Sequence, residues 1–92
     1  MENKYLTIKG NRLIFDYAEK FEIDEYDLFH GEFDVADYRK GMEKLNGNGD
    51  CELLGSNYSM KILNRDGLIE IIFSEGNQSI ELFGLNKKTL PE

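Results

Sequence analysis

The side chains best able to do chemistry are gathered in one stretch, residues 21–37, which reads FEIDEYDLFHGEFDVAD. It holds seven carboxylates and the only histidine of the chain, and it contains no lysine or arginine. Such a stretch could be solvated surface, a metal site, a catalytic site or a surface that meets a basic partner. Each of these four interpretations requires different neighbouring residues.

Acid–base or nucleophilic catalysis would depend on His30 or Cys51, because the chain has one histidine and one cysteine. His30 is followed by Gly31 and Glu32, and a histidine–glutamate pair can transfer protons. No further oriented partner is recognisable, and the simpler interpretation is a loop histidine just before a helix. Cys51 is flanked by two acidic residues, which raise the pKa of a thiol and weaken it as a nucleophile. We therefore predict no catalytic residue and no enzyme activity.

A metal site would need oxygen ligands at a recognisable spacing. Residues 46–50, Asn-Gly-Asn-Gly-Asp, place oxygen side chains at alternate positions, as a calcium-binding loop does. That loop also needs glycine at its sixth position and glutamate at its twelfth, where this chain has Cys51 and Asn57. The carboxylates of residues 24–27 have no known ligand spacing. The sequence therefore predicts no metal and no cofactor.

The distribution of charge favours a basic partner. The formal net charge is −7, yet residues 16–37 contain nine of the eighteen acidic residues and one of the eleven basic residues. The excess of negative charge thus lies in about a quarter of the chain. Direct binding to nucleic acid or to an anionic membrane needs a basic patch, so we expect neither. A basic protein is the partner that this charge suits.

Aromatic residues lie between these acids, and an aromatic side chain within an acidic rim is typical of a protein interface. In an extended segment, Glu22 and Asp24 would lie on one face about 6.6 Å apart, close to the phosphate spacing along a nucleic-acid strand. Glu25 and Asp27 would form a second row on the other face. The predicted partner-binding residues are the acids and aromatics of this stretch: Glu22, Asp24, Glu25, Tyr26, Asp27, Phe29, Glu32, Asp34 and Asp37.

These observations predict a small acidic protein-binding module that inhibits a basic, nucleic-acid-handling protein stoichiometrically. The first specific expectation is an immunity protein that neutralises a nuclease toxin, and a phage-encoded inhibitor of a host defence complex is an alternative. A further alternative is a small structural or regulatory domain, acting as a homodimer, whose acidic residues are solvated surface. The comparison with inhibitors rests on size and charge alone.

Length and composition predict one soluble domain. Ninety-two residues with 40% hydrophobic residues are enough for a single core. One cysteine cannot form an internal disulfide, which favours a reducing compartment. The start of the chain lacks the pattern of a signal peptide, and the apolar runs are far shorter than the ~20 residues of a membrane span. We expect a cytoplasmic protein.

The N-terminal third alternates between apolar and polar residues, which predicts a hairpin over residues 4–23. Lys9-Gly10-Asn11-Arg12 suits a two-residue turn. Pairing Lys9 with Arg12 places four apolar residues on one face, in the pairs Ile8–Leu13 and Leu6–Phe15. The alternation skips near Ala18-Glu19, which indicates a broken or bulged strand. A helix over residues 16–29 is the competing interpretation, and the sequence leaves this choice open.

Helical spacing over residues 34–46 predicts the main helix, with Asp34 as its N-cap and Val35, Tyr38, Met42 and Leu45 on one face. Residues 51–86 predict a three-stranded meander, followed by a short polar tail. The turns at Asp66-Gly67 and Gly76-Asn77 define its register. The predicted fold class is α+β with a mostly antiparallel sheet, in the order ββ(β)αβββ.

One face of the predicted meander should be buried, because its turns bring the larger apolar residues together: Met60, Ile62, Ile71, Phe73, Ile80 and Leu82. The opposite face is half apolar, with Leu68, Ile72, Phe83 and Leu85 among Lys61, Glu70 and Glu81. Because exposed apolar area of this size is costly, we expect the helix, the first hairpin or a second subunit to cover part of it.

Overall fold

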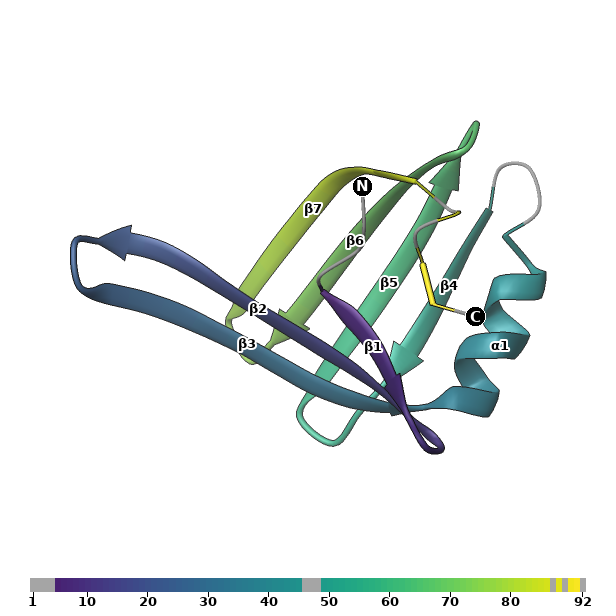
Figure 1. Cartoon of the computed structure of the whole chain (residues 1–92), viewed down its shortest axis with the longest axis horizontal. Coiled ribbons are helices and arrows are strands. Elements are labelled where there is room, and N and C mark those ends of the chain that lie inside the picture. Colours follow the sequence, from purple (N-terminus) through teal and green to yellow (C-terminus); the bar gives the residue numbers. More distant parts are fainter. Residues whose placement is uncertain (1–4, 46–48, 87, 89, 92) are drawn as a thin grey trace.

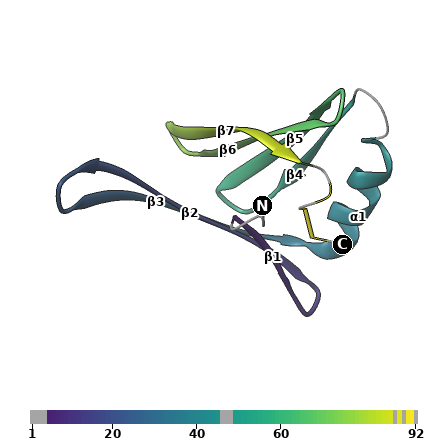
Figure 2. The same cartoon turned by 45° about the horizontal axis from the view of Figure 1, so that its top comes forward.

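The protein folds as two antiparallel sheets and one helix, as predicted for an α+β chain (Figure 1). The structure is a computed structural model that describes residues 5–45, 49–86, 88 and 90–91, and at residues 19–22 and 26–27 it describes the backbone alone. The first sheet has the order β1-β2-β3, and the second has the order β4-β5-β6-β7. The two sheets form two layers, with the helix at one end (Figure 2).

The first sheet begins with the predicted hairpin. Strands β1 (Leu6–Lys9) and β2 (Arg12–Glu22) pair with Lys9 opposite Arg12 and Leu6 opposite Phe15. Gly10 has a φ of 61°, a conformation that glycine adopts without steric cost. The register prediction is therefore confirmed.

The region that the sequence left open is also a hairpin. Strand β2 continues to Glu22 and pairs along its length with β3 (Glu25–Asp34). The helix considered for residues 16–29 is therefore wrong, as is the loop assigned to His30, which lies within β3. The irregularity near Ala18-Glu19 falls slightly later, between Lys20 and Glu22. A bulge there increases the local twist without ending the strand.

The helix α1 (Val35–Glu43) begins directly after β3. Asp34 is its N-cap, and its carboxylate accepts a hydrogen bond of 2.7 Å from the backbone N–H of Ala36. This confirms the predicted start and stabilises the first turn. The helix ends at Glu43 with Lys44 as C-cap, so it is shorter than the predicted range of residues 34–46, and residues 46–48 lie outside the described residues. The predicted face is confirmed, since Val35, Tyr38 and Leu45 are buried and Met42 packs against the core.

The second sheet contains β4 (Gly49–Leu54), β5 (Tyr58–Arg65), β6 (Leu68–Glu75) and β7 (Gln78–Asn86). The meander β5-β6-β7 has the predicted register, with Phe73 opposite Met60 on one side and Ile80 on the other. Strand β4 adds a fourth strand that the sequence analysis did not predict.

A bulge between β6 and β7 corrects the predicted outer face of this sheet. The register shifts between Ile69 and Ile71, and Gly84 on the partner strand has a φ of 74°. The shift turns Leu85 towards the core, where it is half-buried opposite Ile69, because one extra residue reverses the alternation of the side chains. Leu68 and Phe83 stay on the outer face and are 61% and 66% exposed. Neither the helix nor the first hairpin covers these two side chains in the single chain, so cover by a second subunit stays a prediction.

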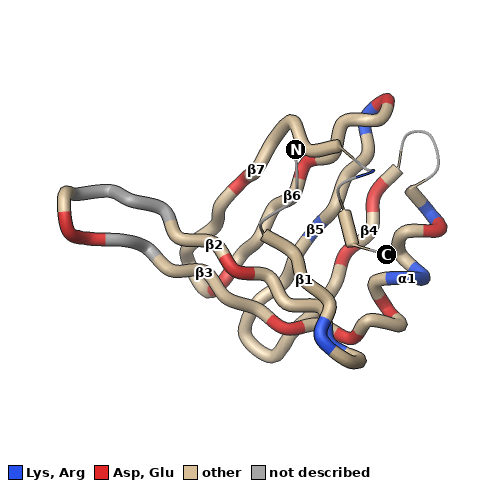
Figure 3. Tube along the Cα trace, viewed as in Figure 1, with Lys and Arg blue, Asp and Glu red and all other residues tan. Residues whose placement is uncertain are grey.

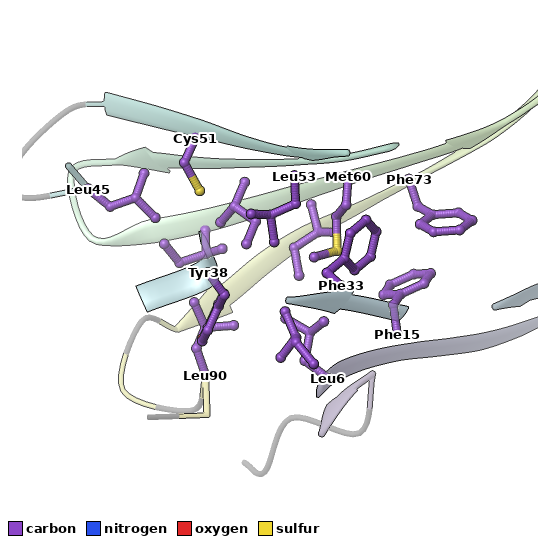
Figure 4. Close-up of a cluster of buried hydrophobic side chains, with 14 of the residues drawn as sticks. Leu6, Phe15, Phe33, Tyr38, Leu45, Cys51, Leu53, Met60, Phe73 and Leu90 are labelled. Atoms are coloured by element: carbon purple, nitrogen blue, oxygen red, sulfur yellow. The ribbon is translucent and has the colours of Figure 1, made fainter. Parts of the chain in front are cut away.

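The core lies between the two sheets and is rich in stacked aromatic rings (Figure 4). Phe73 is fully buried, and its ring stacks on that of Phe15 with centroids 4.6 Å apart. Tyr58 stacks on Phe73 from the same sheet, and Phe29 and Phe33 meet Phe73 edge-on. The confirmed register of β6 thus places Phe73 where both sheets converge.

Candidate functional site

The acidic stretch forms most of a two-stranded arm that extends away from the packed sheets. We define the acidic arm as residues 16–30, from the pairing of Asp16 with His30 to the turn between β2 and β3. Figures 1 and 2 show that β2 and β3 continue beyond the second sheet, on the side opposite α1. The base of the molecule is then the remainder, in which the two sheets and the helix pack together.

The tip of the acidic arm combines acid with exposed apolar surface. Asp24 and Glu25 are exposed, and Ile23 between the strands is 83% exposed. The turn at residues 23–24 separates Glu22 from Asp24, and Glu22 instead pairs through its backbone with Glu25. The predicted row of Glu22 and Asp24 along one extended face is therefore wrong, because the chain reverses between them.

Further along the acidic arm, Leu28 is 73% exposed on β3. Neither Leu28 nor Ile23 was among the predicted binding residues, although both lie within the quoted stretch. Their signal was an apolar side chain with no place in the predicted core. The predicted residues Glu22, Tyr26 and Asp27 lie on the paired backbone of the arm, and their side chains lie outside the described residues.

Phe29 cannot be a surface anchor. Only 4% of it is exposed, and its ring meets Phe73 edge-on with centroids 6.2 Å apart. The prediction that Phe29 contacts a partner is therefore wrong. Its neighbours in sequence, Leu28 and His30, point the opposite way because side chains alternate along a strand. The strand thus divides its residues between the core and the solvent.

His30 lies between two of the carboxylates on the outer face of the first sheet. Its Nδ1 is 2.5 Å from the carboxylate of Asp16, and its Nε2 is 3.6 Å from that of Glu32. The hydrogen bond with Asp16 is the main reason that the pKa of His30 is raised above 6.5, and Glu32 adds to the effect. The side chains of His30, Asp16 and Glu32 are 56%, 66% and 45% exposed. The cluster offsets local negative charge in a way that depends on pH.

The last two predicted acids, Asp34 and Asp37, lie at the start of α1 and stabilise it. Asp34 caps α1, and Asp37 lies in its first turn, where a carboxylate interacts favourably with the helix dipole. Both remain exposed, but their position accounts for their charge without a partner. Basic residues gather at the other parts of the molecule, on α1 and at the turn between β1 and β2 (Figure 3).

The remaining reactive side chain is Cys51, which is buried on β4. Burial raises the pKa of its thiol, and Asp50 raises it further. A Cβ placed on Gly41 of α1 would lie 2.8 Å from the Cys51 sulfur, so the glycine allows the helix to pack closely on this strand. Within the described residues no cluster of three His, Cys, Asp or Glu side chains is arranged to hold a metal ion.

The chain matches no protein-family model, and comparisons with curated proteins and with solved structures give no match. Among the described residues, α1 is the only helix longer than a single turn, and with nine residues it is too short and too polar to cross a membrane.

Proposed function

We propose that the protein is a binding module whose acidic arm inserts into a basic cleft of a nucleic-acid-handling protein and blocks it. The observation that carries the proposal is the arm itself, a hairpin that extends from the base with carboxylates and large apolar side chains exposed together. In this proposal the protein acts by occupying a site, and it catalyses no reaction.

Two properties of the acidic arm support this function. First, its charge is concentrated: Asp16, Asp24 and Glu25 are exposed there, and like charges placed together cost self-repulsion that scattered charges would avoid. Second, the exposed Ile23 and Leu28 offer apolar contact inside the charged surface. Protein interfaces combine such an apolar centre with a polar rim, and charge guides the encounter.

The shape of the arm narrows the class of partner. A two-stranded hairpin is slender enough to enter a groove, and a groove that holds nucleic acid is lined with basic side chains. The most specific form of the proposal is an immunity protein that neutralises a nuclease toxin. A phage-encoded inhibitor of a host defence complex would use the same surface and remains the alternative.

Charge reversal on the arm tests the proposal. The variant Asp16→Lys, Asp24→Lys, Glu25→Lys is compared with the control Glu70→Lys, Glu75→Lys, Glu81→Lys, which changes the net charge equally on the second sheet. A basic protein captured by the wild type is purified, and its association rate and affinity are measured from about 0.05 to about 0.3 M salt. We expect the arm variant to lose affinity by ~10³-fold, because three attractions become repulsions.

The control variant should lose far less affinity, and the captured protein should lose its nucleic-acid binding when the wild type is added. Equal losses in the two triple variants would show that net charge alone matters. An arm variant that binds as tightly as the wild type would reduce the acidic arm to solvated surface.

A second candidate function, homodimerisation, is favoured by the outer face of the second sheet. Leu68 and Phe83 are exposed there, with the half-buried Leu63 and Ile72 on the same face. If a dimer buried this face, the substitution Phe83→Lys would dissociate it, because a charge would then lie in the interface. Sedimentation equilibrium would detect the change. A monomeric wild type at every concentration measured would exclude it.

A further inference from the structure

We infer that the partner is held by β-strand addition, with an extended segment of alternating basic and apolar residues pairing along the open edge of β3. This inference rests on the proposed function, and it names the mode of recognition and the chemistry of the segment. Strand β3 is an edge strand, because the first sheet has the order β1-β2-β3.

The hydrogen bonds of Glu32 show which backbone groups face this edge. Its N–H donates to the hydroxyl of Tyr58 at 2.9 Å, and its C=O accepts from the same hydroxyl at 3.0 Å. Both groups therefore point away from β2. Because backbone direction alternates in an antiparallel ladder, the N–H and C=O groups of His30 and Leu28 point to the same side.

Strand β2 also indicates that the backbone N–H and C=O groups of His30 face the open edge. Asp16 lies directly across from His30, and its N–H donates to the carbonyl of Tyr5 at 3.0 Å, on the β1 side of the sheet. Asp16 and His30 therefore do not bond to each other through their backbones. Within the described part of the chain, no hydrogen bond reaches the outer backbone groups of Leu28 or His30.

The edge is thus closed at one end and open beyond it. Tyr58 closes it at Glu32, and a Cβ on Gly31 would come within 3.0 Å of the rings of Phe73 and Tyr58, so β3 is tightly packed at this point. Towards the tip of the arm, β3 continues beyond the second sheet (Figure 2). An added strand would therefore end near Glu32, where Tyr58 occupies the backbone groups, and could pair with the unoccupied backbone groups of β3 beyond it.

Charge identifies the occupant. Exposed edges are usually protected from unwanted pairing by lysine, proline or a bulge, but β3 contains no lysine, arginine or proline between Glu25 and Asp34. Its protection is negative charge. A second copy pairing edge to edge would bring like charges together, which destabilises cross-strand pairs. A basic strand gains from the same charges.

The alternation of basic and apolar residues that we infer for the partner segment follows from the two faces of the first sheet. Partner residues directly opposite Leu28 and His30 would share the outer face with the carboxylates of Asp16 and Glu32, which suits lysine or arginine. The residues between them would share the inner face with Phe29 and Tyr58, which suits an apolar side chain. Strand addition reads a partner in this way, with backbone pairing for affinity and alternate side chains for specificity.

The test uses a synthetic peptide of about eight alternating lysine and valine residues, long enough for one strand. A second peptide has the same sequence, but the backbone nitrogen of each lysine is methylated. The methylated peptide keeps its charge but cannot pair with β3 through those residues. Binding to the ¹⁵N-labelled full-length protein is followed by chemical-shift titration and amide hydrogen exchange. We expect slower exchange at Leu28 and His30 and at least roughly tenfold weaker binding after methylation.

Matched protein variants provide an independent test. Leu28→Pro removes an N–H that faces the open edge, a position that tolerates proline, whereas Leu28→Ala keeps that N–H. We expect the proline variant to bind the unmethylated peptide at least roughly tenfold more weakly than the alanine variant. The comparison of the two peptides with the wild type decides the question even if the proline variant does not fold.

Equal binding of the two peptides, or binding without slower exchange at Leu28 and His30, would overturn strand addition. The same holds if the unmethylated peptide does not bind. None of these results would touch the proposed function, which the charge-reversal experiment tests with a whole basic protein. An arm that is indifferent to charge reversal would end both proposals.

Discussion

Strands β2 and β3 run through both the base and the acidic arm, yet their side chains meet opposite conditions in the two regions. In the base, Leu13, Phe15 and Phe33 on β2 and β3 are covered by the second sheet and are at most 2% exposed. In the arm, the strands continue with the same backbone pairing, but Ile23 and Leu28 are in solvent. Backbone pairing therefore does not require a covering layer over its whole length.

The base and the acidic arm contribute differently to the stability of the fold. Burial of apolar area stabilises the base, whereas an uncovered two-stranded ribbon adds little to stability by itself. The arm is held in place because its root is anchored, with Phe29 packed against Phe73 and the Glu32 backbone bonded to Tyr58. An anchored root and an uncovered end suit a surface that presents itself to a partner.

The largest expected effect is in the base. Phe73→Ala should lower the free energy of unfolding by about 3–5 kcal/mol, because it removes the ring on which both sheets converge and leaves a cavity. Urea denaturation monitored by circular dichroism measures the change. A loss below about 1 kcal/mol would contradict the two-layer core, since surface substitutions cost that little.

A smaller loss is expected at Asn64, the one polar residue among the buried side chains of the described core. Its amide donates to the Leu45 carbonyl at 2.6 Å after the helix, and its side-chain oxygen accepts from the N–H of Gly67 at 2.9 Å in the β5–β6 turn. Asn64→Leu leaves both backbone groups without this partner, which should cost about 1–3 kcal/mol. Asn64→Asp, which keeps the acceptor, should retain slower amide exchange at Gly67 than Asn64→Leu.

The sequence was sufficient where alternation and turn residues agree. The first hairpin has the predicted register, and so does the β5-β6-β7 meander as far as the bulge at Gly84, because glycine-containing turns fix which residues face each other. The N-cap at Asp34 was predictable for a similar reason: a short polar side chain before an apolar helical face satisfies free N–H groups.

The sequence was insufficient where a small residue occupies a buried position. The inner face of β3 carries Phe29, Gly31 and Phe33, and the glycine interrupts the apolar alternation. The rings of Phe73 and Tyr58 fill the space that its side chain would need. That packing depends on strands far along the chain, so a local pattern cannot reveal it. The same cause led to the incorrect assignment of Phe29 as a surface residue.

The site was predictable in its charge but not in its shape. The acid of residues 21–37 is evident from composition, whereas the reversal at residues 23–24 has none of the usual glycine or asparagine turn signals. The strand pairing that builds the arm, and with it the exposure of Ile23 and Leu28, depends on that reversal. Leu85 is a parallel case, since a bulge at Gly84 reversed its predicted face.

A still smaller effect is expected at the root of the arm, where stability should depend on pH through His30. The pKa of His30 is raised above 6.5 in the folded protein, chiefly by the hydrogen bond with Asp16. Its stabilising contribution is therefore fully present below the unfolded-state pKa and is lost as pH rises through the folded-state pKa. Because these side chains are exposed, we expect a loss below about 1 kcal/mol.

Urea denaturation at about pH 6 and about pH 9, on either side of the histidine titration, measures this loss. His30→Ala should remove that part of the pH dependence and should leave partner binding almost unchanged, because the backbone edge of β3 remains. An identical pH dependence in the wild type and in His30→Ala would show that the Asp16–His30 pair does not contribute to stability. A loss of activity at unchanged stability would instead assign His30 a chemical role.

The smallest effect on stability is expected at the end of the arm. Ile23→Thr and Leu28→Thr exchange exposed apolar side chains for a β-branched polar residue that suits a strand. Because both side chains are in solvent in the free protein, each change should alter the free energy of unfolding by no more than about 0.5 kcal/mol. The same changes should weaken binding to a captured basic partner, since the apolar contacts of the interface are lost.

Phe73→Ala provides the contrast, with a large loss of stability in the base. If either threonine variant lost as much stability as a core substitution, the arm would be packed against something in the free protein. If neither variant affected binding, recognition would rest on charge and backbone pairing alone.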